Sequence, residues 1–194
     1  MPPIVDADAL VVLGGSMSCQ DDAEAPWLAP TRQLISRTVR AGTPFLGICL
    51  GHQLATVALG GQVCTSDHFC LGAAEMHLTP EGKKDPLLSV YDGHRGIHFN
   101  NDVAVVLPED AVLLARDPTG QIEAVRFAER AWGVQFHPEC TPEIFDAWTI
   151  GHGEKEWQQR LPWSEAVTVA ETVRRDIDTC LLYTSDAADE RSSV

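Results

Sequence analysis

The segment Pro44-Phe-Leu-Gly-Ile-Cys-Leu-Gly-His-Gln53 decides the fold that we expect for this chain. Its first five residues form a short, largely apolar run, which is typical of a strand buried in a parallel sheet. From Gly51 to Leu59 the sequence favours a helix, and two further glycines follow its end. Cys49 therefore stands on a tight strand-to-helix turn with a glycine two residues away on each side. This pattern predicts a strained elbow that presents a thiol nucleophile, because small neighbours avoid clashes there. The alternative is a buried structural cysteine between two packing glycines.

The chain before this segment predicts another strand and another helix. Residues 9–13 form a second short apolar run, which ends in Gly14 and Gly15. Residues 16–25 are polar and include three acidic side chains, which indicates a loop. Residues 27–40 carry apolar side chains at helical spacing, with a proline in the first turn.

The C-terminal half predicts mostly short strands separated by turns rich in Pro, Gly, Asn and Asp. We expect these strands at residues 73–78, 97–99, 103–106, 112–115, 123–127 and 132–136. Thr141 can cap a helix that begins at Pro142 and reaches about Trp148. A last helix is expected over residues 164–178. Strands that alternate with helices, followed by a β-rich half, predict an α/β fold with a mostly parallel central sheet.

His137 and Glu139 lie at the end of an apolar run, in Trp132-Gly-Val-Gln-Phe-His-Pro-Glu139. Two residues apart in extended backbone, their side chains share one face. Glu139 can therefore orient His137, and His137 can take the proton of Cys49, which is the logic of a catalytic triad. Alone, a His-x-Glu pair is equally compatible with a solvated turn at a strand end.

Composition restricts the classes of function. The chain has 194 residues and is 44% hydrophobic, which suits one globular domain. A formal charge of −14 disfavours nucleic acid as a partner. The sequence contains no run of about 18 apolar residues, so no membrane span is expected. Because no secretory signal is visible, we interpret the six cysteines as free thiols of a cytoplasmic protein. Cys64, His68, Cys70 and His77 match no zinc-binding spacing, so no metal site is expected.

Residues 180–194 read CLLYTSDAADERSSV and resemble the translation of a common sequencing adapter. A disordered polar tail is the alternative. We therefore expect a single domain over residues 1–179 and a non-native or disordered tail over 180–194. Without that tail, 13 basic and 25 acidic residues remain, so the formal charge becomes 13 − 25 = −12.

Three motifs together resemble those of the class I glutamine amidotransferases: VVLGGSMS at residues 11–18, GICLGHQ at 47–53 and GVQFHPE at 133–139. The resemblance implies a flavodoxin-like sheet with helices on both faces and a triad of Cys49, His137 and Glu139. It also implies an oxyanion hole from the backbone N–H groups of Gly15 and Leu50. The residues implied to bind glutamine are Gly14, Gln53, His98, Phe99 and Asn100.

The resemblance also sets the expected substrate and partners. It implies hydrolysis of the glutamine side-chain amide through a γ-glutamyl thioester, without a cofactor. The candidate partner that it implies is a separate, ammonia-accepting synthase subunit. Two alternatives stay open: a γ-glutamyl amide or peptide hydrolase with the same triad, and an unproductive binding or regulatory module. A cysteine elbow also occurs in the DJ-1/PfpI-like group, but the His-Pro-Glu motif argues against that group.

The sequence departs from the family pattern in three places, one of which is Cys70-Leu-Gly72, where relatives often have an acidic residue before the glycine. The first strand and helix of the fold are expected to be missing, because the chain enters its first predicted strand within ten residues of Met1. Phe99 and Asn100 stand where related proteins usually have tryptophan and histidine, so the fit of glutamine is the open question. Asn100 can form hydrogen bonds but cannot act as a base.

Overall fold

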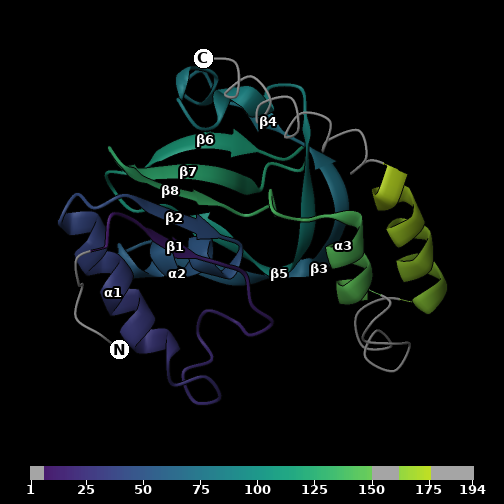
Figure 1. Ribbon diagram of the computed structural model, residues 1–194, viewed down its shortest axis with the longest axis horizontal. Coiled ribbons are helices and arrows are strands. Elements are labelled where there is room, and N and C mark those ends of the chain that lie inside the picture. The colour runs from purple at the N-terminus through teal and green to yellow at the C-terminus, as the bar shows by residue number, and fades with distance from the viewer. Residues whose placement is uncertain (1–6, 150–161, 176–194) are drawn as a thin grey trace.

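A six-stranded sheet forms the centre of the computed structural model, which describes residues 7–149 and 162–175 (Figure 1). Its strand order is β1-β2-β8-β7-β6-β4. The strands are β1 (Leu10–Val12), β2 (Phe45–Ile48), β8 (Ala131–Val134), β7 (Ile122–Ala128), β6 (Val112–Arg116) and β4 (His77–Leu78).

The predicted α/β class is confirmed, but the parallel part of the described sheet is smaller than predicted. β1, β2 and β8 run parallel, whereas β7, β6 and β4 are added by antiparallel pairing. The physical reason is that β6, β7 and β8 follow one another through short turns, which join antiparallel neighbours and leave no room for a crossover helix.

A second sheet consists of two long antiparallel strands, β3 (Gln62–Glu75) and β5 (Arg95–Val106). The sequence predicted only short, separate strands here, at residues 73–78, 97–99 and 103–106. The turn-forming residues inside them do not end the strands, because each strand pairs with the other across two register shifts. Gly72 takes a φ of +115° within β3, which suits a glycine. We call this pair of strands the β3–β5 ribbon.

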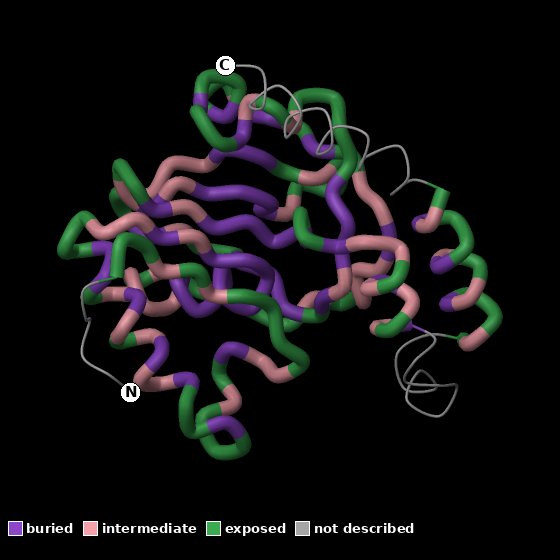
Figure 2. The backbone as a smooth tube through the Cα atoms, in the orientation of Figure 1, coloured by how far each residue is buried: buried purple, intermediate pink, exposed green. Residues whose placement is uncertain are grey.

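The two faces of the central sheet are covered differently. α1 (Leu28–Arg40) and α2 (Leu50–Ala58) contribute to the same hydrophobic core, on one face. The core on the other face includes Leu78 of the strand β4, and Tyr91 of η2 (Ser89–Tyr91) packs against it. The short helix η1 (Gly82–Lys84) contacts β6. In the described ranges, the helices on this second face are short 3₁₀ helices. Figure 2 shows buried residues concentrated along the strands between these cores.

The C-terminal helices pack against the ribbon and not against the central sheet. α3 (Pro142–Thr149) begins at the predicted residue, and residues 163–175 form another helix. Phe145, Ala170 and Val173 share a core with Ile97 of β5. The end of the predicted helix, residues 176–178, and the predicted tail, residues 180–194, lie outside the described residues.

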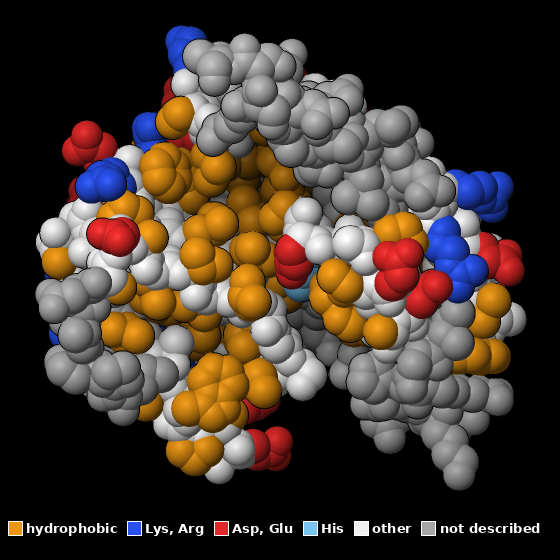
Figure 3. Space-filling model, viewed as in Figure 1, with side chains coloured by type: hydrophobic (Ala, Val, Ile, Leu, Met, Phe, Trp, Pro, Cys, Tyr) orange, Lys and Arg blue, Asp and Glu red, His pale blue; other side chains and the backbone are white. Residues whose placement is uncertain are grey.

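An apolar groove of about 350 Å³ crosses the exposed end of the sheet beside β1 and β2. Its lining residues are Ala9, Leu10, Val11, Pro44, Phe45, Leu46, Pro86, Leu87 and Trp132. Figure 3 shows hydrophobic side chains gathered in a hollow on the face of the sheet turned to the viewer. β1 is the edge strand of the described sheet, and the expectation of a further strand beside it stays a prediction. No helix within the described ranges is both long and apolar enough to cross a membrane.

Candidate active site

Cys49 occupies a strained turn between β2 and α2. Its φ of 50° makes it the one non-glycine residue with positive φ in the described part of the chain. Its N–H donates to the carbonyl of Val134 at 2.8 Å, which ties the turn to β8. A Cβ on Gly47 would lie 2.6 Å from the carbonyl carbon of Gly51, and a Cβ on Gly51 would collide with the carbonyl of Val12. Both glycines are therefore required by close backbone approach, as the pattern predicts.

His137 and Glu139 follow the end of β8. The Nδ1 atom of His137 lies 2.7 Å from Oε1 of Glu139. Because a carboxylate only accepts, Nδ1 carries the proton and donates it, and Nε2 is then the nitrogen that can accept one. A Cβ built on Gly14 would lie 2.9 Å from Cε1 of His137 and 3.7 Å from Cβ of Cys49. The structure thus brings Cys49 and the imidazole of His137 together against Gly14, at the carboxyl ends of β1, β2 and β8.

The thiol of Cys49 is held in its protonated form. Burial raises its pKa to about 12, and the charge of Glu139 acts in the same direction. The backbone N–H of Leu50 opposes this shift but does not outweigh it. The desolvation of the sulfur therefore exceeds the stabilisation of a thiolate at the start of α2. A reaction at Cys49 requires a base that removes the proton as the sulfur attacks, and His137 is adjacent.

Gly15 and Leu50 lie against one another beside the elbow. A Cβ on Gly15 would lie 2.7 Å from Cδ2 of Leu50. Leu50 is the first residue of α2, so its N–H has no partner within the helix and points toward the sulfur of Cys49. The N–H of Leu50 thus lies at the sulfur, and Gly15 lies against the side chain of the same residue.

A pocket of about 280 Å³ opens beside Cys49. Of the residues expected at the substrate, Gln53, Phe99 and Asn100 line it. Gly14 lies next to it, beside Gly15. His98 does not reach it, since its side chain is buried against Glu123 of β7. His98 lies two residues before Asn100 on β5, and β5 contacts β7, the strand of Glu123. The side chain of His98 is therefore directed to β7 and lies beyond the pocket.

Asp102 organises the wall of this pocket, although it was not among the residues expected to bind glutamine. Its carboxylate accepts hydrogen bonds from the hydroxyls of Ser18 at 2.6 Å and Thr65 at 3.0 Å. Its carbonyl accepts from the amides of Gln53 and Asn100. The two-residue spacing between Asn100 and Asp102 in a strand is the signal that places these side chains on one face.

Asp21 is the second acidic residue of the pocket, and no Lys or Arg is among the described residues that line it. The remaining lining residues were also not predicted as site residues: Ser16, Met17, Ser18, Thr65, Phe69 and Asn101. A wall with two carboxylates and no basic side chain favours a ligand that carries an ammonium group.

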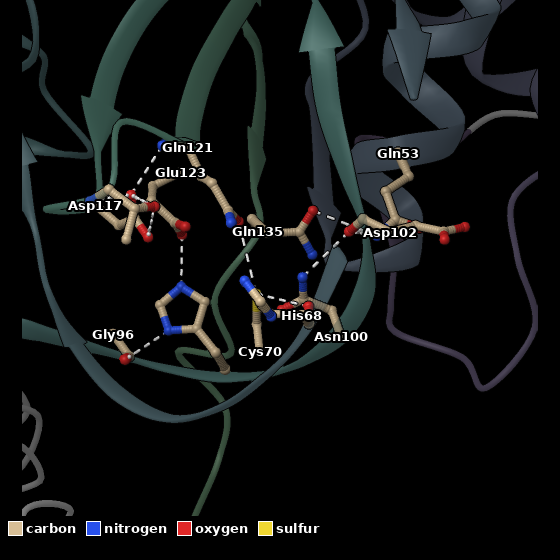
Figure 4. Close-up of polar contacts among 12 residues, drawn as sticks. Gln53, His68, Cys70, Gly96, Asn100, Asp102, Asp117, Gln121, Glu123 and Gln135 are labelled. Carbon is tan, nitrogen blue, oxygen red and sulfur yellow. Dashed lines mark hydrogen bonds and ion pairs between the residues drawn. The ribbon is translucent and has the colours of Figure 1, made fainter. Parts of the chain in front are cut away.

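Three buried amide or imidazole groups near the elbow have atoms without a hydrogen-bond partner. These atoms are Nδ1 and Nε2 of His52, Nε2 of Gln135 and Oδ1 of Asn100. His52 is fully buried and stacks on Phe127 with ring centroids 5.8 Å apart. Burial lowers the pKa of His52 to about 4, so its ring is neutral. Gln135 and Asn100 lie close together beside Gln53 and Asp102 (Figure 4).

The residues considered for a metal do not form a cluster. Cys64 is exposed near the start of β3, and His77 is exposed at the start of β4. The thiol of Cys70 contacts the side chain of Gln121. Within the described ranges, no group of three or more His, Cys, Asp or Glu side chains could hold a metal ion.

The fold and this site define an α/β protein with a cysteine elbow beside a His–Glu pair. The sequence model of one family, glutamine amidotransferase class-I, matches residues 3–151. The chain therefore belongs to the class I glutamine amidotransferase family.

Individual relatives agree with this assignment. The chain is 32% identical over 161 residues to the glutamine amidotransferase-like protein YfeJ of Salmonella typhimurium, covering 80% of this chain and 66% of that protein. It is 29% identical over 139 residues to one subunit of the glutamine-hydrolysing GMP synthase of Methanothermobacter thermautotrophicus, covering 69% and 66% respectively. The chain thus spans slightly less than two thirds of the length of these relatives.

A solved structure shares the fold. A glutamine amidotransferase from Methylobacillus flagellatus has a TM-score of 0.76 and 25% identity, with 92% of this chain and 74% of that chain covered.

Proposed function

We propose that the chain hydrolyses the side-chain amide of glutamine, or of a closely related γ-glutamyl compound, to give glutamate and ammonia. The observation that carries this proposal is the strained Cys49 beside a His137 whose Nδ1 is held by Glu139. Membership of the family and the names of its relatives support the same reaction.

The proposed chemistry follows from the protonated state of the thiol. As the sulfur of Cys49 attacks the amide carbon, its proton passes to Nε2 of His137, and the carbonyl oxygen becomes an oxyanion. The N–H groups of Gly15 and Leu50 stabilise that oxyanion, and one such donor is worth about 3 kcal/mol in other enzymes. His137 then gives the proton to the departing ammonia, which leaves a γ-glutamyl thioester. Water, deprotonated by His137, attacks the thioester, and the thiol and glutamate are released.

The charge of the pocket supports an amino acid as substrate. Asp21 and Asp102 offer carboxylates to an ammonium group, while Phe99 and Asn100 contribute an aromatic and an amide surface. These last two side chains differ from the tryptophan and histidine that are usual in the family. That difference favours a γ-glutamyl amide or peptide as the second candidate substrate.

The test is the release of ammonia from glutamine by the purified full-length chain, compared with Cys49→Ala. Cys140→Ala is the matched control, because Cys140 is also buried but does not line the pocket. We expect turnover that Cys49→Ala abolishes and Cys140→Ala retains. Turnover of γ-glutamyl anilides or dipeptides in place of glutamine would favour the second candidate. Folded protein with no turnover of either class would reject both, and a non-catalytic binding role would then be preferred.

The proposed partner is a separate synthase subunit that accepts the ammonia, because one relative is itself a subunit of a GMP synthase. An acceptor that binds the chain should raise glutamine turnover. An unchanged rate in the presence of such a synthase would argue for a free-standing hydrolase.

A further inference from the structure

A second His–Glu pair, in which both side chains are buried, lies outside the pocket between β5 and β7. Nε2 of His98 is 2.6 Å from Oε2 of Glu123, and the two side chains are only 6% and 2% exposed. Nδ1 of His98 is 3.0 Å from the carbonyl of Gly96 (Figure 4). Because a carbonyl only accepts, Nδ1 carries a proton, and a single further proton lies between Nε2 and Glu123.

The proton in this pair is strongly held. Burial favours the neutral imidazole of His98, but the hydrogen bond and the charge of Glu123 raise its pKa overall. Burial likewise raises the pKa of Glu123, against the effect of His98. Removing one partner would leave the other buried without its hydrogen bond, which is far more costly than losing an exposed pair.

The same two strands hold the backbone that carries the proposed base. The N–H of Gln135 donates to the carbonyl of Glu123 at 2.8 Å. The N–H of His137 donates to the carbonyl of Ile97, also at 2.8 Å. The segment from Gln135 to His137 is therefore bound on one side to β7 and on the other to β5. The side chains of Glu123 and His98 also join these two strands directly. Glu123 is the residue whose carbonyl accepts from Gln135, and His98 follows Ile97, whose carbonyl accepts from His137.

We propose that the His98–Glu123 pair positions His137 relative to Cys49 by fixing the distance between β5 and β7. This inference rests on the proposed function, since it assigns a role to a base in that reaction. The pair touches neither the pocket nor the thiol, so it is a positioning pair and not part of the catalytic set. Its effect passes through two backbone hydrogen bonds.

Substitutions at Glu123 separate the hydrogen bond from the charge. In Glu123→Gln, the amide N–H can donate to Nε2 of a neutral His98, so the link between the strands remains. Glu123→Ala removes the link and leaves a cavity. The double variant His98→Leu/Glu123→Leu keeps the volume apolar without an unpaired polar group, and such replacements commonly fold. Asp85→Asn is the control, because Asp85 is equally buried but bonds to Trp132, to the backbone of residues 87 and 88 and to Arg126 of β7.

Two readouts test the proposal: kcat and KM for glutamine, and the rate at which iodoacetamide alkylates Cys49 at about pH 7, followed by peptide mass spectrometry. His137→Ala sets the rate of alkylation without the base. We expect Glu123→Ala and the double variant to lower both kcat and alkylation by about 10- to 100-fold, the effect of a displacement near 1 Å. For Glu123→Gln, kcat and the alkylation rate should stay within about fivefold of those of the native chain, a factor that corresponds to the net free energy of one ordinary hydrogen bond. Asp85→Asn should change the thermal midpoint but not the alkylation rate.

The outcomes discriminate between roles. A folded double variant that keeps the native alkylation rate and kcat would overturn the proposal. A rise in KM with unchanged alkylation would assign the pair to the pocket wall, through Asn100 on β5, and would also overturn it. Alkylation does not require glutamine turnover. If the native chain fails to hydrolyse glutamine, the proposed function fails, while the comparison of alkylation rates still decides whether the pair positions His137.

Discussion

Gly14 lies against both side chains of the proposed nucleophile and base, so its lack of a side chain is part of the site. A Cβ at this position would lie 2.9 Å from Cε1 of His137, which is closer than carbon atoms normally approach. In Gly14→Ala the imidazole must move away, and we expect kcat for glutamine to fall by about tenfold or more. Steady-state kinetics measure the loss, and circular dichroism verifies that the variant folds. A folded Gly14→Ala chain with native kcat would show that His137 is not held where the structure has it.

His52 predicts a dependence of stability on pH. Its ring is neutral in the fold, with a pKa lowered to about 4 by burial, whereas an unfolded chain has the ordinary value near 6.5. The unfolded state therefore binds a proton first as the pH falls, so stability decreases from about pH 6.5 down to about pH 4. At about pH 5 this one residue should cost about 2 kcal/mol relative to about pH 8.

The check on His52 is a comparison of urea unfolding for the native chain and His52→Leu at about pH 8, 6 and 5. Leucine has a similar volume and no titratable group, and it also removes the two unpartnered nitrogens. We expect the difference in free energy of unfolding between the two chains to shift in favour of the variant as the pH falls. A difference that stays constant over this range would mean that His52 acquires a partner or a proton in the fold.

Among the elements, α3 carries the aromatic side chain that supports the proposed base. The ring centroid of Trp148 lies 4.6 Å from that of His137 and 5.8 Å from that of Phe99, so it touches both the base and the pocket wall. We expect Trp148→Ala to lower kcat by about tenfold, because the imidazole loses its packing surface. Trp148→Phe retains a ring and should be intermediate. Equal kcat for all three folded chains would assign α3 to stability alone.

The elements near Cys49 could be predicted from sequence because their signals are local. A short apolar run followed by glycines places β1, β2 and the start of α2 within one or two residues of the observed bounds. The His–Glu contact follows from the period of an extended segment, which needs no partner strand. These features depend on residues that are neighbours along the chain.

The ribbon and the antiparallel half of the sheet could not be predicted in the same way. Gln62 to Glu75 forms one strand only because β5 supplies its hydrogen bonds, across turn-forming residues that suggest a break. His98 was expected at the substrate because the resemblance to the family implies that its segment lines the pocket. Its actual partner, Glu123, is 25 residues away, and no local pattern connects the two.

At the scale of the whole molecule, β1, which is the edge strand of the sheet in residues 7–149, and the apolar groove beside it predict self-association. Val11 lines this groove and is 54% exposed on that strand, and an edge strand with apolar surface is a common site of association. The formal charge of −14 opposes association at low ionic strength. We therefore expect the weight-average mass in analytical ultracentrifugation to rise with protein concentration and with added salt, since salt screens repulsion but not apolar contact.

Substituting Val11 with residues of opposite charge distinguishes apolar burial from charge as the force that holds such an assembly. Val11→Lys and Val11→Glu both place a charge in the groove, so both should weaken association by about tenfold if apolar burial drives it. If charge were the cause, lysine would strengthen association of this acidic chain and glutamate would weaken it. Val105→Lys is the matched control, because Val105 is 48% exposed on β5 and does not line the groove. A chain that stays monomeric at all concentrations and salt levels, and unfolds in one cooperative thermal transition, would show that the edge of β1 is tolerated as it stands.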